Sequence, residues 1–278
     1  MSEATSVEAW SGKDRADENF PVGSRLIRRD LRPHIHAFYA FARIADDIAD
    51  SPALAPADKI ARLDRMQAVL LGAAGTDAPS AARLRTSLAA TGTTAVHATD
   101  LLVAFRRDAR RGRTESWEEL AEYCRYSAMP VGRHVLDLQG EDRATWAPSD
   151  ALCTALQVLN HLQDAAADLA ALDRCYLPQA LLDQHGAAVA DLRRPAETPA
   201  LRAVFAALLE RVATLNTTAA ALPRRVRDRR LRLETALILG LSRRLARRLR
   251  REDPLAGRVT LHRIDVAGAV LAAFGAWR

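Results

Sequence analysis

Aromatic residues, lysine and cysteine are all scarce in this chain of 278 residues. Phe, Trp and Tyr together make up 5% of it, and Lys13 and Lys59 are its only lysines. Strands favour aromatic and β-branched residues, whereas Ala, Leu and Arg, which dominate from end to end, favour helices. We therefore predict an all-α fold, for which 49% hydrophobic residues supply a substantial core.

Cysteines and long apolar runs are also too few to build certain classes of protein. Cys124, Cys153 and Cys175 are odd in number and widely spaced, which argues against a disulfide framework and against a zinc site. Residues 1–20 contain no apolar run typical of a signal peptide, and the uncharged stretch 266–277 is too short to span a bilayer. We expect a cytoplasmic protein that at most lies on a membrane.

The positive charge is almost entirely arginine, and the formal net charge is +6. Such a balance can attract nucleic acid, anionic lipid or an acidic small molecule, but no DNA-binding motif is recognisable, so nucleic acid is not an expected partner. The segment 222–251 interleaves leucine with arginine at helical spacing. It could lie on an anionic lipid surface, although a core helix with a solvated arginine face is favoured about two to one.

The chain reads as a polar N-terminus followed by one domain. Residues 1–18 are predicted to be disordered, and residues 19–278 to form a single all-α domain without any strand. The breaks between helices are rich in Pro or Gly and short enough to join neighbours of one bundle. Helices are predicted, with ends uncertain by about 2–4 residues, at 31–50, 57–73, 80–90, 94–111, 116–126, 130–138, 149–172, 199–220, 223–251 and 262–276.

The first predicted helix carries a stripe of polar residues on an otherwise apolar segment. Tyr39, Arg43, Asp46 and Asp50 are spaced four, three and four residues apart, and so share one helix face. Asp47 projects well away from that face. Taken alone, the stripe is more often a solvated face than the lining of a cavity.

A second helix, far away in the sequence, repeats the pattern. Gln157, Asn160, Asp164 and Asp168 are spaced three, four and four residues apart, again with apolar residues on the other faces. Mg²⁺ prefers hard oxygen ligands and is usually held by one or two carboxylates plus substrate phosphates. Two helices with aspartates one turn apart therefore favour divalent-metal binding to a diphosphate, inside a cavity that shelters a carbocation from water.

The two motifs resemble those of the squalene/phytoene synthase family of isoprenoid synthases, and the resemblance covers most of the chain. The first is D-x-x-x-D preceded by Tyr and Arg, and the second is Q-x-x-N-x-x-x-D-x-x-x-D followed here by "CYLP". The resemblance implies a helical bundle around a central cavity. It also implies a prenyl diphosphate substrate and about two or three Mg²⁺ ions that bridge to the diphosphate.

The resemblance further implies a role for each matching residue. The residues that would hold Mg²⁺ are Asp46, Asp50, Asn160, Asp164 and Asp168. Those that would act in catalysis are Arg43 and Gln157, which contact the diphosphate, and Tyr39, which helps shape the ionisation site. Substrate binding would involve Asn19, Phe20, Arg43, Gln157, Asn160 and the late basic residue Arg258.

Within this family, "ENFPV", "YCRYSAMPVGRHVL" and "NHLQD" resemble the hydroxysqualene synthase branch of bacterial hopanoid biosynthesis. Gln163 stands where most relatives carry Arg, and Asn19 to Pro21 replace a Ser-Phe-Ser stretch, which suggests weaker support for a second diphosphate. The branch implies that presqualene diphosphate ionises, rearranges and captures water to give hydroxysqualene, with no need for NADPH.

Alternatives stay open. The chain could instead condense prenyl diphosphates, as a presqualene diphosphate, squalene or dehydrosqualene/phytoene-type synthase. It could also be a non-catalytic family member that acts as an interaction protein, although its intact aspartates argue against this. Peripheral membrane contact and contact with upstream and downstream squalene-pathway enzymes are further candidates. His134 and His161 are interpreted as helix histidines with satisfied hydrogen bonds.

Overall fold

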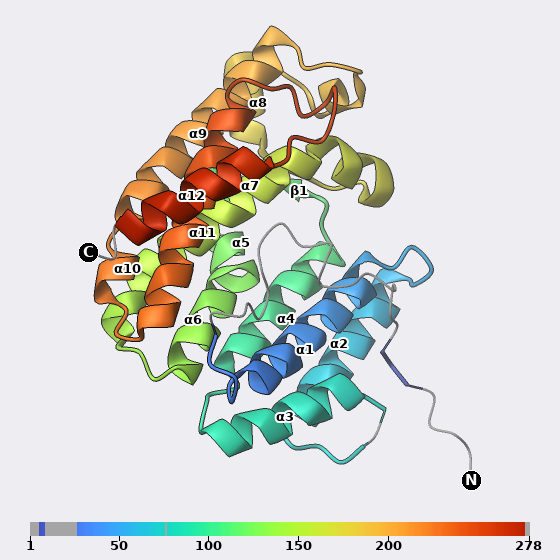
Figure 1. The fold of residues 1–278 in the computed structure, drawn as a ribbon. Helices are drawn as coiled ribbons and strands as arrows, with labels where there is room; N and C mark the ends of the chain where they lie inside the picture. The colour runs from blue at the N-terminus through green and yellow to red at the C-terminus, as the bar shows by residue number, and fades with distance from the viewer. Residues whose placement is uncertain (1–5, 9–26, 76, 276–278) are drawn as a thin grey trace. The chain divides into compact units, whose positions relative to one another are not determined.

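The computed structural model describes residues 6–8, 27–75 and 77–275. Its chain divides into two compact units, Met1–Arg111 with Arg133–Glu141 and Gly112–Gly132 with Asp142–Arg278, which are described separately below. Most of the stretch predicted to be disordered lies outside the described residues, as do Asn19 and Phe20. The single-domain reading stays a prediction, and the all-α prediction is confirmed within each unit (Figure 1).

The first unit is a group of helices packed on α1. It contains α1 (Arg32–Asp50), α2 (Pro56–Leu70), α3 (Pro79–Thr91), α4 (Val96–Asp108) and the second half of α6 (Met129–Leu138). Helix α1 contacts α2, α3 and α4, as Figure 1 shows. Their apolar faces form a core whose largest fully buried side chains include Phe41, Ile48, Leu63, Met66, Leu84 and Leu101.

The sequence at both ends of α1 fixes its length. Pro33 occupies the first turn, where a missing N–H costs nothing, and Ser51 leaves the helix with ψ 120° because it precedes Pro52. The apolar residues Phe38, Phe41, Ala45 and Ile48 face the core. Asp46 and Asp50 therefore lie in the last two turns of α1.

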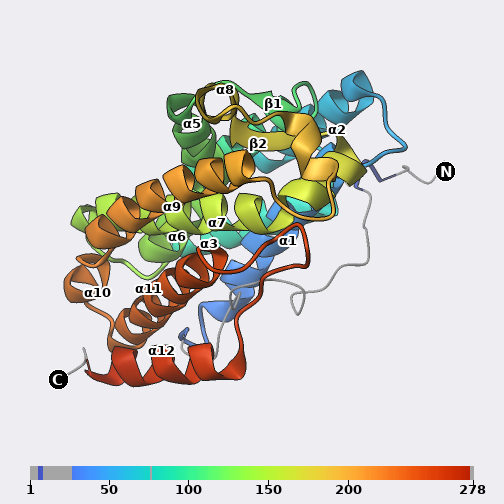
Figure 2. The same ribbon diagram turned by 90° about the horizontal axis from the view of Figure 1, so that it is seen from above.

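The second unit is built on the long helix α7 (Trp146–Leu172). It packs against α9 (Pro199–Ala219) and α11 (Arg229–Leu249), and α11 packs in turn against α12 (Arg263–Gly275), as Figure 2 shows. The remaining helices are α5 (Trp117–Ser127), the first half of α6, the 3-10 helices η2 (Arg143–Thr145) and η3 (Val189–Arg193), α8 (Gln179–His185) and α10 (Leu222–Arg225). Among the described residues no helix has both the length and the apolar character needed to cross a membrane.

Two strands correct the prediction that the chain forms none. β1 (Arg113–Thr114) pairs in parallel with β2 (Cys175–Pro178), and the Cys175 N–H donates to the Gly112 carbonyl at 2.7 Å. Gly112 permits the close approach, because a Cβ there would lie 2.5 Å from the Asp173 carbonyl oxygen. Strands this short carry no readable alternation, so tertiary contact decides them.

Two helix predictions were wrong in detail. The stretch read as a break after Pro178 contains α8, which ends at Gly186 in the left-handed region with φ 68°. The helix predicted over 223–251 is divided into α10 and α11. Asp228 causes the division, because its side chain accepts hydrogen bonds from the Arg230 and Leu231 N–H groups and so begins α11.

Candidate functional site

The four predicted site residues of α1 share one half-buried stripe. Tyr39, Arg43, Asp46 and Asp50 are all half-buried, in contrast to the core-facing residues between them. The Arg43 guanidinium donates through Nη1 to Asp46 at 3.1 Å and through Nη2 to Asp47 at 2.8 Å. Asp46 and Asp47 project from different faces of the helix, but the long side chain of Arg43 lets its guanidinium reach both carboxylates. Asp47, which is 8% exposed, is thus a partner of Arg43 that the sequence interpretation missed.

Negative charge is crowded around Asp46. Burial and the neighbouring Asp50 raise the pKa of Asp46 to about 8, with smaller contributions from Asp108 and Asp47, and Arg43 opposes the rise. The last turn of α1 contains no basic residue, although the C-terminus of a helix carries partial negative charge. The Asp46 side chain nevertheless keeps 36% of its surface exposed. A cation that reaches this carboxylate would relieve the repulsion.

The second stripe lies where it was predicted, on one face of α7. Gln157, Asn160, Asp164 and Asp168 are all half-buried, whereas Leu159, Leu162 and other apolar residues of the helix are buried. The stripe ends one turn before the end of α7, where Asp173 adopts the left-handed conformation with φ 49°.

Arg258 lies against this second stripe. Its Nε donates to Oδ1 of Asp164 at 2.8 Å and its Nη2 to Oδ2 at 3.2 Å, which is a two-point ion pair. Arg258 precedes α12, and its side chain is 49% exposed. The structure therefore brings together a predicted phosphate-binding residue and a predicted metal ligand.

Gln163, at the position where most relatives carry Arg, contacts the segment that carries Arg258. Its side chain is turned inward, is 5% exposed, and donates through Nε2 to the Val259 carbonyl oxygen at 2.5 Å. Val259 is the neighbour of Arg258, so Gln163 fastens the backbone that carries the guanidinium. Gln163, which replaces an arginine, thus holds by a hydrogen bond the backbone next to another arginine, Arg258.

An aromatic stack next to Gln157 was not predicted. The His161 ring lies 3.8 Å from the Tyr176 ring at an interplanar angle of 20°, and Tyr123 lies beside both. His161 Nε2 is 3.3 Å from the Gln157 side-chain amide nitrogen. Gln157 and His161 are one helical turn apart, and this spacing could have predicted their contact from the sequence. Tyr176 belongs to the "CYLP" stretch.

His134 corrects the expectation of a satisfied histidine. It is 2% exposed and stacks on Phe38 with ring centroids 3.9 Å apart. Within the described part of the chain, neither of its ring nitrogens has a hydrogen-bond partner. Burial, together with the nearby His97 and His34, lowers its pKa to about 3, so the ring is neutral.

The two stripes belong to different units, so their meeting around one cavity stays a prediction. In residues 6–8, 27–75 and 77–275 no three His, Cys, Asp or Glu side chains are grouped to hold a metal ion by themselves. The donors fit Mg²⁺ in kind, because each stripe offers hard oxygen ligands and Asp46 is crowded by like charge. None of the three cysteines, all of which the structure describes, forms a disulfide bond.

Residues 13–265 match the family model described as squalene/phytoene synthase. The chain belongs to the squalene/phytoene synthase family. As a member of it, the protein is an enzyme that acts on a prenyl diphosphate.

Three relatives match this family member over nine tenths or more of their own length. The hydroxysqualene synthase of Rhodopseudomonas palustris is 46% identical, covering 97% of this chain and 91% of the relative. That of Zymomonas mobilis is 44% identical, covering 95% and 90%. The crystal structure of squalene synthase HpnC from Alicyclobacillus acidocaldarius is similar with a TM-score of 0.75 and 37% identity, covering 85% of this chain and 90% of that one.

Proposed function

We propose that this enzyme converts presqualene diphosphate to hydroxysqualene. The observation that carries the proposal is the identity of 46% and 44% to two proteins named hydroxysqualene synthase, in each case across at least nine tenths of both chains. The branch-specific stretches "ENFPV" and "YCRYSAMPVGRHVL" support the same choice.

The reaction needs a site that draws a diphosphate away from carbon. Mg²⁺ would supply the charge neutralisation, and its ligands would be Asp46, Asp50, Asn160, Asp164 and Asp168. Arg43, which already bridges two aspartates on α1, and Gln157 would contact the diphosphate. Arg258 would offer a second guanidinium, since its ion pair with Asp164 can open when a phosphate arrives.

The chemistry balances without a reductant. The carbon–oxygen bond to the diphosphate breaks and its electron pair leaves with the diphosphate, after which the cyclopropylcarbinyl cation rearranges to an allylic cation. A water oxygen forms the new carbon–oxygen bond and then loses one proton. One carbon loses a bond to oxygen and another gains one, so the carbon skeleton has no net change of oxidation state and NADPH has no part. Tyr39 would shape the place where ionisation occurs.

A comparison of two substrates tests this proposal against its condensing alternatives. With Mg²⁺ present, purified enzyme should convert presqualene diphosphate and be slow or inactive with farnesyl diphosphate alone. Formation of presqualene diphosphate from farnesyl diphosphate at a comparable rate would contradict the proposal and favour a condensing synthase. If the protein consumes neither presqualene diphosphate nor farnesyl diphosphate, the non-catalytic alternative is favoured.

A further inference from the structure

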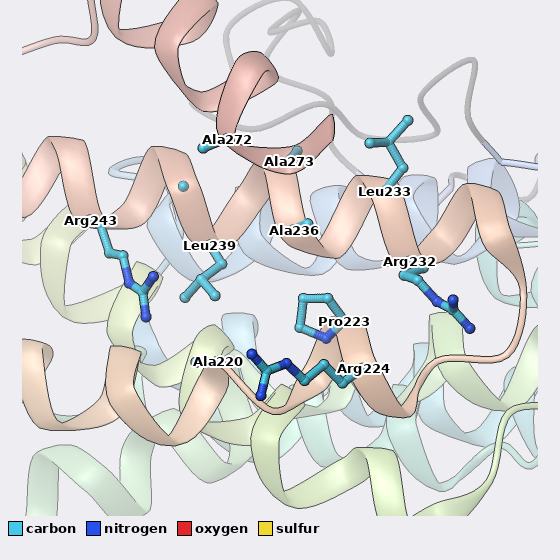
Figure 3. A pocket seen from close by; sticks show the side chains of 11 residues that line it. Ala220, Pro223, Arg224, Arg232, Leu233, Ala236, Leu239, Arg243, Ala272 and Ala273 are labelled. Carbon is cyan, nitrogen blue, oxygen red and sulfur yellow. The ribbon is translucent and has the colours of Figure 1, made fainter. Parts of the chain in front are cut away.

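A pocket of about 450 Å³ lies within the second unit, along one face of α11. Its walls come from the end of α9, from α10, from α11 and from α12 (Figure 3). The size is that of a site for a small organic molecule. None of the residues assigned above to the reaction lines this pocket.

Three arginines and no acid line the pocket. Arg224 comes from α10, and Arg232 and Arg243 come from α11. In Figure 3, Arg224 and Arg243 extend toward Leu239 from their two helices. An unopposed group of guanidinium ions is an anion-binding feature, because each presents several N–H donors to phosphate or carboxylate oxygens.

Neutral backbone groups hold two of these arginines in place. Arg232 donates through Nε and Nη2 to the Val226 carbonyl at 3.1 and 3.0 Å, and Arg243 donates through Nη2 to the Asn216 carbonyl at 3.2 Å. Within the part of the chain that the structure describes, none of the three pocket arginines pairs with a carboxylate. Their positive charge is therefore positioned but not neutralised.

The rest of the pocket and its border are apolar. Leu233, Ala236, Leu239 and Ala273 line the walls beside the arginines. Next to the pocket, Ala269 of α12 packs closely on Gly240 of α11. A Cβ atom added at Gly240 would lie 3.2 Å from the Cβ of Ala269.

Another face of α12 is open to solvent. It leaves Ile264 79% exposed and Leu271 74% exposed. These two large apolar side chains are seven residues apart, so they lie on one face of the helix. Helix α12 thus lines the cationic pocket through Ala272 and Ala273 and carries exposed apolar residues on another face, and a helix with exposed apolar residues near cationic ones is typical of a surface that lies in a membrane interface.

We propose that this pocket binds the phosphate headgroup of an anionic membrane phospholipid, with Ile264 and Leu271 inserted at the acyl boundary. A free phosphate would need the arginines but would leave the exposed face of α12 unexplained. A lipid uses both features at once. The proposal does not depend on the reaction assigned above.

Vesicle sedimentation tests the proposal. The full-length protein should bind vesicles that contain phosphatidylglycerol and not vesicles of phosphatidylcholine alone. Replacing the three pocket arginines together (R224Q, R232Q and R243Q) should weaken binding about a hundredfold, since each arginine near an anionic surface contributes roughly fivefold. Combined I264Q and L271Q should weaken it at least about tenfold, because two apolar side chains no longer leave water.

A matched control separates the pocket from overall charge. Arg83, Arg110 and Arg251 are exposed and lie outside the pocket, so R83Q, R110Q and R251Q together lower the net charge equally. This control should bind within about twofold of the wild type. Equal losses of vesicle binding in both triple variants would overturn the proposal. So would a wild-type protein that does not bind the vesicles but is stabilised against heat by inorganic phosphate through the pocket arginines. Circular dichroism and melting confirm that each variant is folded.

Discussion

Arg258 forms a two-point ion pair with Asp164, from which 94 residues separate it in the sequence. The pair joins the segment before α12 to the polar stripe of α7. In the metal-free protein it neutralises one carboxylate of the second aspartate motif, and it holds a guanidinium at the proposed diphosphate site.

Asp164→Asn should nearly abolish turnover and leave the fold intact. The ion pair that it breaks is partly exposed, with side chains 49% and 30% accessible, so its loss costs about 0–1 kcal/mol of stability. The loss of a charge that helps stabilise the leaving group should lower the rate on the order of 10²-fold or more. A product assay and a thermal melt at saturating Mg²⁺ measure both effects.

Asp173→Asn is the matched control for that variant. It makes the same chemical change just beyond α7 and breaks the ion pair of Asp173 with Arg113, but it lies outside the stripe. Asn tolerates the left-handed conformation of this position. Near-native activity of Asp164→Asn, or an equal loss in Asp173→Asn, would contradict the assignment of Asp164 to the site.

Gln163→Met should lower both stability and activity. It leaves the buried Val259 carbonyl without its side-chain donor, at a cost of about 1–3 kcal/mol, and it loosens the backbone beside Arg258. Because Gln163 acts through Arg258, adding Gln163→Met to Arg258→Gln should reduce kcat/KM no further than Arg258→Gln alone. Fully additive losses in this double-mutant cycle would show that Gln163 affects the reaction by another route.

Helical periodicity was sufficient to predict α1, α7 and the residues of their polar stripes, since those follow from a repeat of 3.6 residues. The contact of Arg258 with Asp164 could be anticipated only as a resemblance, because nothing local relates positions so far apart. The inward turn of Gln163 and the pairing of β1 with β2 depend on backbone groups supplied by other segments. The ion pair of Asp47 with Arg43 was missed because helical projection ignores the reach of the Arg43 side chain.

The metal-free protein should lose stability as the pH rises, owing to Asp46. The pKa of Asp46 in the folded protein, about 8, lies above the ordinary value of 3.8. Its contribution to stability is therefore fully present below pH 3.8 and is lost as the pH rises to about 8. Asp46→Asn removes this dependence and should melt at a higher temperature than the wild type at the alkaline end. The measurement is the melting temperature of both proteins as a function of pH, with a chelator present. The same pH dependence in the wild type and in Asp46→Asn would refute the crowding of charge at Asp46.

His134 should act in the opposite direction. Its folded pKa of about 3 lies below the ordinary value of 6.5, so stability is present above 6.5 and is lost as the pH falls toward 3. Lowering the pH from about 6.5 to about 5 should cost roughly 2 kcal/mol through this residue. His134→Phe keeps the stack on Phe38 and should flatten that acid slope in chemical denaturation, whereas an unchanged slope would mean that the ring is not held neutral.

Incubation of the purified enzyme with presqualene diphosphate and Mg²⁺, in water labelled in its oxygen and without NADPH, tests the central claim most directly. The account predicts hydroxysqualene that carries the label in its hydroxyl group, because solvent is the terminating nucleophile. A hydrocarbon product, a requirement for NADPH or an alcohol without the label would contradict it.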